Sequence, residues 1–394
     1  MQNIVNKIFV NCYSIYMKVN CLNYLFFYLI FFLFFSCSKH KNEEITIPNI
    51  PLASTFFKGM DLSFQLELEN FNVQYKDENN TPISVLPFVK QKGTNLIRLK
   101  LWCNPSKGLN SLAAVKSYAL RIVQNNMSFM LDIHYSDTWA DPSNQTPPAA
   151  WQNLTLDELK AQVYAYTKQV LIEFKTQGTT PAFVQIGNET DSGFLWNYGK
   201  VWNSFNNNWV NYAALFNKGS QAIREVCGAN TKIIFHHSSV ENSIFFLNQL
   251  IAYPIDYDVI GLSYYPQFQT KNLELVETKL NTLAANFNKE IMIVEVAYPF
   301  TLGYNDSLNN YVGSADQIIP NYPPTPQGQK DFMLKMITII KNIPNNKGIG
   351  FVYWAPDWVS FLGNNATSTN GSSWENQCIW DFNNKALPVF DIFQ

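Results

Sequence analysis

The sequence has few charged side chains. Only 15% of its 394 residues are charged and the net charge is −2, so the chain lacks the basic surface that nucleic-acid binding requires. Hydrophobic residues make up 47% of the chain, and 30 Phe, 20 Tyr and 10 Trp are among them. This composition allows a large core, and the aromatic excess suits flat apolar ligands such as sugar rings.

Several common signatures are also missing. Cys103, Cys227 and Cys378 are the cysteines beyond position 38, an odd and widely spaced set that predicts neither a disulfide framework nor a metal site. No glycine-rich phosphate loop follows the first apolar strand, which removes the usual reason to expect a dinucleotide-binding fold. No linker, charge block or low-complexity segment interrupts residues 54–394. We therefore expect a single domain there.

The N-terminal region reads as an export signal. Residues 24–35 form an almost unbroken apolar run, preceded by Lys18, which is too short for a comfortable transmembrane helix and has the order of a signal peptide. We expect residues 1–37 to be this signal and residues 38–53 to be a flexible tether.

Cys37 directly follows the small residue Ser36, an order that resembles a bacterial lipoprotein signal. In that case Cys37 is lipidated, the protein lies at the outer membrane or cell surface, and the lipid is its only membrane contact. Phe34 stands where such signals usually have an aliphatic residue, so plain secretion or a periplasmic location is the alternative.

Strand-like and helix-like patterns alternate over the rest of the chain. The helical patterns include residues 155–174, which open with a capping box of Thr155 and Glu158, and residues 212–228, which end on the natural C-cap Gly228. The expected strands are 56–63, 96–102, 127–136, 182–189, 232–239, 257–266, 291–299 and 348–358. Eight strands alternating with helices predict a parallel α/β fold, and the count of eight favours a (β/α)8 TIM barrel.

Active sites of such barrels lie at the carboxyl ends of the strands. The expected strand ends supply mostly polar and aromatic side chains: Asp61, Arg98, Trp102, His134, Asp137, Asn188, Glu189, Tyr264, Tyr265, Glu295, Tyr298, Trp354 and Trp358. Glu189 ends the fourth expected strand and Glu295 lies in the seventh, and these two strands face each other across a barrel mouth. A pair of carboxyl groups roughly 5–5.5 Å apart is the equipment for cleaving a glycosidic bond with retention.

The other strand-end residues fit the same chemistry. A cation such as Arg98 would lower the pKa of a nucleophilic carboxylate, and a like charge would raise the pKa of the proton donor. Asn188 is placed to bond a sugar hydroxyl. Each residue alone also has a plain structural reading: Arg98 as an ordinary ion-pair residue, His134 as a core histidine, and Trp354 as packing. Glu295 is harder to explain that way, because its strand is otherwise apolar.

Seven stretches, in order along the chain, resemble those of glycoside hydrolase family 53, the endo-β-1,4-galactanases. They are "KGMDLS", "GTNLIRLKLW", "LDIHYSDTWADPSNQTPPAAW", "VQIGNETDSGFLW", "YDVIGLSYYPQF", "VEVAYPFT" and "SSWENQCIWDF". The resemblance covers about 57–387. It implies a (β/α)8 barrel that cleaves β-1,4-galactan side chains of pectin with retention and needs no cofactor. The polysaccharide is the expected partner, and a monomer is expected.

By this resemblance, Glu189 matches the acid/base and Glu295 the nucleophile. The resemblance also assigns orienting or sugar-binding roles to Arg98, His134, Asn188, Tyr264 or Tyr265, and Trp354. Asp61, Trp102, Trp139 and Trp196 are expected as further contacts in the substrate groove.

The chain also departs from the family pattern. Ala355 and Asp357 in "YWAPDW" replace the usual "YWEPAW", and Lys100 replaces an arginine. Some bacterial members bind calcium after the seventh strand, where this chain offers Asn305, Asp306, Asn309 and Asn310. These oxygen-bearing side chains suit calcium, although asparagine-rich loops are common without a metal.

Two alternatives stay open from the sequence. The altered "YWAPDW" loop is compatible with a related hydrolase of another β-linked glycan, such as mannan or glucan. The lipoprotein-like start is compatible with a surface glycan-binding protein without catalysis, although the presence of both glutamates argues against it.

Overall fold

The computed structural model describes residues 56–202, 208–368 and 370–394. The expected signal segment 1–37 and tether 38–53 lie outside these residues. Eight strands form a closed barrel in chain order, and every neighbouring pair is parallel. The strands are β1 Phe57–Asp61, β2 Leu96–Leu101, β3 Ser128–Ile133, β4 Phe183–Ile186, β5 Lys232–His237, β6 Val259–Tyr264, β7 Glu290–Val296 and β8 Gly348–Tyr353. The predicted (β/α)8 barrel is confirmed.

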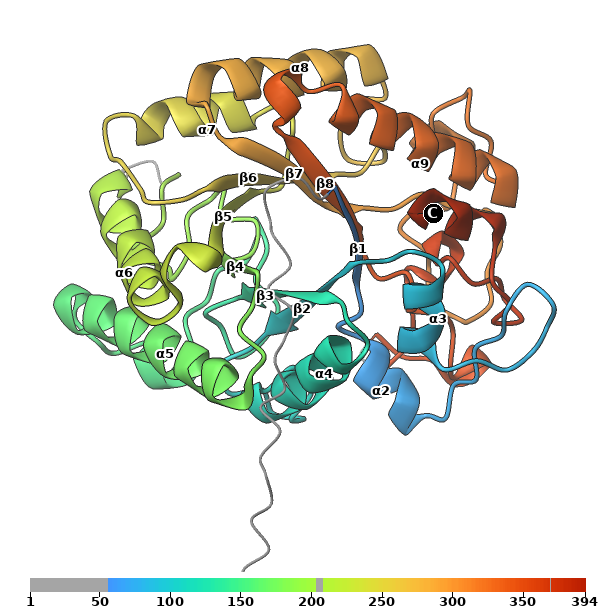
Figure 1. Cartoon of the computed structure of the whole chain (residues 1–394), viewed down its shortest axis with the longest axis horizontal. Helices are drawn as coiled ribbons and strands as arrows, with labels where there is room; N and C mark the ends of the chain where they lie inside the picture. Colours follow the sequence, from blue (N-terminus) through green and yellow to red (C-terminus); the bar gives the residue numbers. More distant parts are fainter. Residues whose placement is uncertain (1–55, 203–207, 369) are drawn as a thin grey trace, which may run out of the picture. The chain divides into compact units, whose positions relative to one another are not determined.

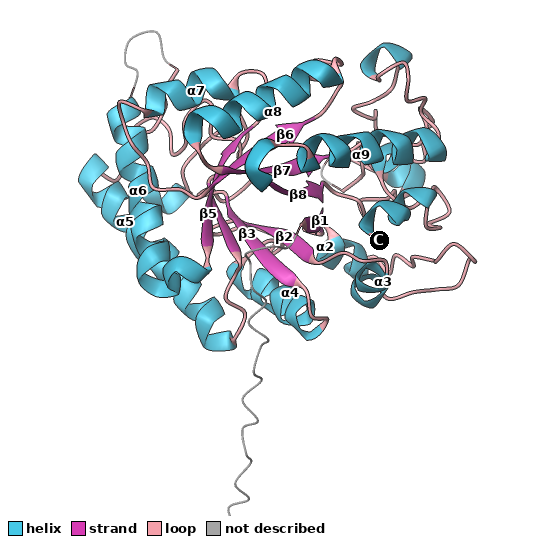
Figure 2. Ribbon diagram, turned by 45° about the horizontal axis from the view of Figure 1, so that its top comes forward, coloured by secondary structure: helices cyan, strands magenta, loops and turns pink. Residues whose placement is uncertain are grey.

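The helices lie around this barrel (Figures 1 and 2). They are α2 Gln65–Asn70, α3 Val85–Gln91, α4 Leu112–Gln124, α5 Leu156–Gln177, α6 Trp209–Cys227, α7 Ser243–Leu250, α8 Leu273–Phe287 and α9 Pro326–Lys341. No helix in the described ranges combines the length and apolar character needed to cross a membrane.

Two predicted helix ends are confirmed. The Thr155 side chain accepts a hydrogen bond from the Glu158 backbone and Glu158 bonds back, so the capping box starts α5. Gly228 follows α6 with a positive φ of 68°, which glycine adopts without a steric penalty. The sequence reading did not identify the short helices α2, α3 and α7, because segments of six to eight residues show too little periodicity.

The barrel interior changes character along the strands. A separate apolar cluster fills one layer with side chains from all eight strands: Phe57, Leu96, Met130, Phe183, Ile234, Val259, Met292, Val294 and Val352. Because alternate residues of a strand share one face, the residues two positions further on enter the same interior nearer the carboxyl ends. On β2 to β5 these are Arg98, Asp132, Gln185 and His236. The polar layer therefore lies directly above the apolar one.

Candidate active site

A cavity of 920 Å³ opens at the carboxyl ends of the strands. Each of the eight strands supplies at least one lining residue, within the strand or just after its end: Asp61, Arg98, His134, Glu189, Ser238, Tyr265, Glu295 and Trp354 in strand order. Of the predicted site residues, Asn188 and Trp139 also line it. Residues that are far apart in the sequence thus meet at one barrel mouth, as expected for this fold.

The exit from β4 presents Glu189 to the cavity. Gly187 has a φ of 75°, and a Cβ there would lie 2.5 Å from Thr190 Cγ2, so the turn requires glycine. Glu189 itself is left-handed, with a φ of 44°, a conformation that is uncommon for a residue with a side chain. Such backbone strain is found where function fixes a side chain. The strand therefore ends by aiming one carboxyl group inward.

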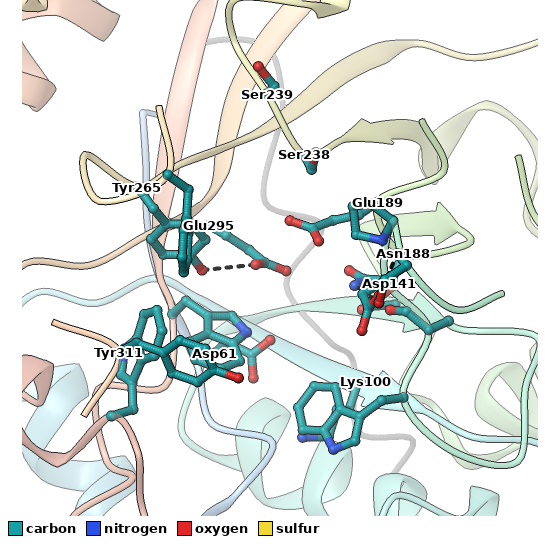
Figure 3. Close-up of a pocket in the computed structure, with 18 of the residues that line it drawn as sticks. Asp61, Lys100, Asp141, Asn188, Glu189, Ser238, Ser239, Tyr265, Glu295 and Tyr311 are labelled. Carbon is teal, nitrogen blue, oxygen red and sulfur yellow. Dashed lines mark hydrogen bonds between the residues drawn. The ribbon is translucent and has the colours of Figure 1, made fainter. Parts of the chain in front are cut away.

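Glu295 reaches the same cavity through an irregularity in β7. Met292 and Val294 belong to the apolar layer, so strict alternation would turn the next residue, Glu295, outward. The pairing of β7 shifts register against both of its neighbours just before or around this residue. A bulge of this kind re-aims a side chain, and Figure 3 shows Glu295 pointing toward Glu189 across the cavity.

Glu295 is held by two donors. One oxygen lies 2.9 Å from the Arg98 guanidinium, and the other accepts a hydrogen bond of 2.9 Å from the Tyr265 hydroxyl. Both partners stabilise the ionised carboxylate. The sequence left Tyr264 and Tyr265 as alternatives at this position, and the structure places Tyr265 here.

Arg98 is the centre of a buried polar network. Its guanidinium donates to Asp61 at 2.7 Å, to Asp132 at 2.9 Å and to Asn188 at 2.9 Å. The His134 Nε2 lies 3.0 Å from the same Asp132 oxygen. These charge-assisted bonds join β1, β2, β3 and β4 beneath the cavity. Arg98 is thus more than a single ion-pair residue, because it orients four neighbouring acceptors.

The two glutamates have perturbed pKa values. Burial, together with the negative charge of Glu295, raises the pKa of Glu189 well above its ordinary range. Burial also raises the pKa of Glu295 to about 7, and Arg98 and Tyr265 oppose that rise. The predicted effect of Arg98 has the right sign but is smaller than the effect of burial. Because Arg98 contacts Glu295 directly, Glu295 is the member of the pair that ionises first.

Aromatic rings form much of the cavity wall. Trp354 lies 4.6 Å from Trp374 between ring centroids, at an interplanar angle of 80°, and 6.4 Å from Trp139. Trp358, Phe268 and Tyr311 also line the cavity. Such rings suit the apolar C–H faces of sugars, while the carboxyl and amide groups suit the hydroxyls.

Three predicted contacts lie away from the cavity lining. The Tyr264 hydroxyl donates to the Thr270 carbonyl, and the Trp196 ring is covered by the Lys200 ammonium at 3.8 Å. Trp102 does not line the cavity but contacts a residue that does, because its Nε1 donates to the His134 Nδ1 at 3.3 Å. Strand-end position alone could not show which face each of these side chains takes.

Of the residues that depart from the family pattern, Lys100 lies at the cavity and Asp357 does not. Lys100 lines the cavity, whereas Asp357 is fully buried outside the lining and neither of its carboxylate oxygens has a hydrogen-bond partner in the described ranges. Burial raises the pKa of Asp357 well above its ordinary range. The acidic residue of "YWAPDW" therefore does not stand in for a carboxylate at the cavity.

The described structure does not support the predicted calcium site in the asparagine-rich loop. Both Asp306 oxygens accept backbone N–H groups, from Leu308 at 2.7 Å and Ser372 at 2.9 Å, and the Asn310 amide donates to Gly303. Asn305 and Asn309 are exposed. Calcium takes about six to eight oxygen ligands, and the described part of the chain contains no group of three or more His, Cys, Asp or Glu side chains arranged for a metal.

The sequence did not predict two residues that contact Glu189. His236 lies in the polar layer and Ser263 lies near the end of β6, and both are at 0% exposure. The available signal was "FHHSS", which places histidines at a strand end, and the serine directly before the two tyrosines in "LSYYP". Neither residue was among the predicted site residues, and their contacts identify them.

Eight parallel strands with two carboxyl groups facing each other at the barrel mouth define the class of the protein: a glycoside hydrolase on a TIM barrel. The family model "Glycosyl hydrolase family 53" matches residues 57–393. The chain therefore belongs to glycosyl hydrolase family 53.

Several known proteins are similar to the chain. The arabinogalactan endo-β-1,4-galactanase of Cellvibrio japonicus is 34% identical over 347 residues, which are 86% of this chain and 90% of the relative. The endo-β-1,4-galactanase of Bacillus subtilis is 30% identical, over 91% of this chain and 90% of the relative. Among solved structures, the family 53 catalytic domain of Ignisphaera aggregans has a TM-score of 0.80 and 32% identity, over 88% of this chain and 97% of that domain.

Proposed function

We propose that the protein is an endo-acting, retaining glycoside hydrolase that cleaves β-1,4-galactosidic bonds in galactan and arabinogalactan, including side chains of pectin. The observation that carries the proposal is that Glu189 and Glu295 face each other across the cavity (Figure 3), in a chain of family 53. The named relatives are galactanases, and no feature of the cavity favours mannan or glucan over galactan.

The reaction has two steps. In the first, the Glu295 carboxylate attacks the anomeric carbon while the bond to the leaving oxygen breaks and Glu189 gives its proton to that oxygen. In the second, Glu189 takes a proton from water, the water oxygen attacks the anomeric carbon, and the bond to Glu295 breaks. Two carboxyl groups and water balance both steps, so no cofactor takes part.

The surrounding residues position these groups. Arg98 and Tyr265 hold Glu295 from two sides, which fixes the attacking oxygen. Asn188 lines the cavity beside Glu189, and its amide nitrogen donates to the Ala140 carbonyl at 2.9 Å, so its second hydrogen remains for a sugar hydroxyl. Trp354 supplies the ring face under the sugar.

Export and lipid anchoring through Cys37 are a further part of the proposal. They are supported by the apolar run at residues 24–35 and the small residue before Cys37. Expression with labelled palmitate tests this part: a Cys37→Ala variant should lose the label and leave the membrane fraction. Label on the Cys37→Ala variant would contradict it.

A panel of purified polysaccharides tests the main proposal. Linear β-1,4-galactan should release reducing ends rapidly, with oligosaccharides as early products because the enzyme is endo-acting. Strong release from mannan or glucan and none from galactan would overturn the substrate assignment. Binding of galactan without release over a long incubation would instead indicate a glycan-binding protein.

A further inference from the structure

His236 joins the exit of β4 to the end of β6. Its Nδ1 accepts a hydrogen bond of 3.2 Å from the Glu189 backbone N–H and one of 2.9 Å from the Gln185 side-chain amide. Its Nε2 lies 2.9 Å from the Ser263 Oγ. The Ser263 hydroxyl in turn donates to Glu189 Oε1 at 2.7 Å. A closed ring of contacts therefore runs from the Glu189 backbone through His236 and Ser263 to the Glu189 carboxyl group.

These contacts fix the hydrogen positions. A backbone N–H can only donate, so Nδ1 of His236 must be the unprotonated nitrogen of the ring. A neutral imidazole then carries its hydrogen on Nε2 and donates it to Ser263 Oγ. With that oxygen already accepting, the serine hydrogen is directed to Glu189 Oε1. Each hydrogen bond of the ring thus has only one direction.

The direction of the Ser263 hydrogen bond decides which oxygen of Glu189 carries the acidic hydrogen. When Glu189 is protonated, Oε1 accepts from Ser263, so the acidic hydrogen resides on Oε2. Oε2 is the oxygen without a hydrogen bond from this ring. The proton that must reach the glycosidic oxygen is therefore kept off the serine-bonded oxygen.

His236 also holds the strained backbone. Its carbonyl accepts from the Thr190 N–H at 3.0 Å and from the Thr190 hydroxyl at 3.2 Å, directly after the left-handed Glu189. Contacts on both sides of Glu189 over-determine its conformation, which is how a strained residue persists.

We propose that His236 and Ser263 are positioning residues that hold Glu189 and direct its acidic proton to Oε2. This inference rests on the proposed role of Glu189 as proton donor. His236 stays neutral as the ring requires, because burial and the nearby Arg98 lower its pKa well below the ordinary value. Asp132, His134 and His237 are the other titratable groups that act on it.

The variant Ser263→Ala tests the proposal. Loss of a hydrogen bond to a carboxyl group should reduce kcat/KM on galactan roughly 10- to 100-fold. A dinitrophenyl β-galactobioside has a leaving group that needs no proton, so its kcat/KM, which reports the first step alone, should fall by less than about threefold, since acid catalysis contributes little to that step. A merely structural serine would affect both substrates alike.

The pH profile gives a second readout. The Ser263 hydrogen bond lowers the pKa of Glu189, while burial, Glu295 and Asp191 raise it and Arg98 lowers it. Removing the hydroxyl therefore raises that pKa, Glu189 keeps its proton to higher pH, and the alkaline limb of kcat/KM on galactan should move to higher pH. An unmoved limb together with equal losses on both substrates would overturn the proposal.

Two further variants complete the design. His236→Asn keeps an acceptor near the Nδ1 position for the Glu189 N–H but is too short to place a donor at the Nε2 position next to Ser263, so it should show the same substrate split as Ser263→Ala. Ser220→Ala is the matched control, because the Ser220 hydroxyl is equally buried but bonds Phe216 and Asp256 in the region of α6, and it should leave the profile unchanged. Wild-type enzyme that fails to cleave galactan would count against the proposed function, whereas the split between variants concerns the positioning residues alone.

Discussion

The two layers inside the barrel are built from the same eight strands but do different work. The lower layer contains only apolar side chains, among them Met130 and Phe183. The upper layer, two residues further along, contains Asp132 and Gln185 instead. Burial of the lower layer stabilises the fold, whereas the upper layer places buried charges that need partners. One step of the strand period thus separates the part that holds the barrel together from the part that carries the chemistry.

The comparison explains why the upper layer is so densely bonded. A buried carboxylate is costly unless it is paired, and Asp61, Asp132 and Glu295 all contact the one guanidinium of Arg98. Glu189 is the exception, since its nearest described partner is the neutral Ser263. The proton donor is therefore the least compensated carboxyl group of the four, which is what keeps its proton on at neutral pH.

The largest expected effect is loss of activity without loss of fold. Glu189→Ala should lower kcat on galactan about 10²- to 10⁴-fold, the usual contribution of general acid catalysis, and Glu295→Ala should lower it at least as much because no covalent intermediate can form. Glu290→Gln, at the opposite end of β7 where Glu290 pairs with Lys232, is the matched control and should keep full activity. Initial rates on linear galactan measure all three. Near-wild-type turnover in either alanine variant would remove that residue from the mechanism.

The next effect is loss of stability without loss of activity, from a substitution in the lower layer. Met130→Ala should lower the free energy of unfolding by about 2–5 kcal/mol, because the fully buried side chain leaves a cavity. The kcat of the folded fraction should stay within about threefold of wild type, since no cavity residue moves directly. Denaturant unfolding and initial rates separate the two quantities. If activity per folded molecule fell as far as in Glu189→Ala, the division into two layers would be wrong.

A smaller effect is a gain in stability when Glu189 loses its titration. Burial raises the pKa of Glu189 in the folded state, so between the unfolded value of about 4.3 and the folded value the native protein holds a proton that the unfolded chain has lost. Stability therefore falls as pH rises through this window. Glu189→Gln removes the titration and should raise Tm by about 2 °C at pH 8, with a much smaller gain at pH 4. Thermal melts at both pH values check this sign, and an equal change at both would contradict it.

The smallest effect concerns substrate binding by Lys100. Its ammonium lies 3.9 Å from the Phe64 ring centre and 3.8 Å from that of Trp139, and it has no hydrogen-bond acceptor or ion pair within the described ranges. Since it lines the cavity, it is free to donate to a sugar hydroxyl. Lys100→Met should raise KM for galactan by about tenfold, the value of one charged hydrogen bond, with kcat within about threefold.

The pH dependence of KM is a second test of substrate binding by Lys100. Burial lowers the pKa of Lys100 to about 8, so the ammonium is lost above that value and the wild-type KM should rise there. The rise should be absent in Lys100→Met and unchanged in the exposed control Lys107→Met. A KM of Lys100→Met equal to that of wild type at pH 7 would show that Lys100 only packs against its rings.

The sequence was sufficient to predict the eight strands and the position of Glu189 and Glu295 at one barrel mouth. Parallel strands all present their carboxyl ends on one side, so Glu189 and Glu295 could be brought together without coordinates. The reason Glu295 faces inward could not be predicted, because the bulge in β7 depends on the pairing with β6 and β8. Without it, period-two alternation would place Glu295 outside the barrel.

Side-chain direction was the main source of error. Tyr264 and Tyr265 are adjacent, and only the register of β6 decides that Tyr265 reaches Glu295. Trp196 lies in an irregular segment, where no period relates position to direction, and it packs under Lys200 instead of lining the cavity. The ring through His236 and Ser263 joins three strands, so no local pattern marks it.

The central claim is that Glu189 and Glu295 act as proton donor and nucleophile in a two-step cleavage with retention. Proton NMR of the first product released from linear β-1,4-galactan by the wild-type enzyme tests this most directly. The new reducing end should appear first as the β-anomer and only later mutarotate, because two displacements restore the configuration. A reducing end that appears first as the α-anomer would contradict it, since that outcome requires a single displacement by water.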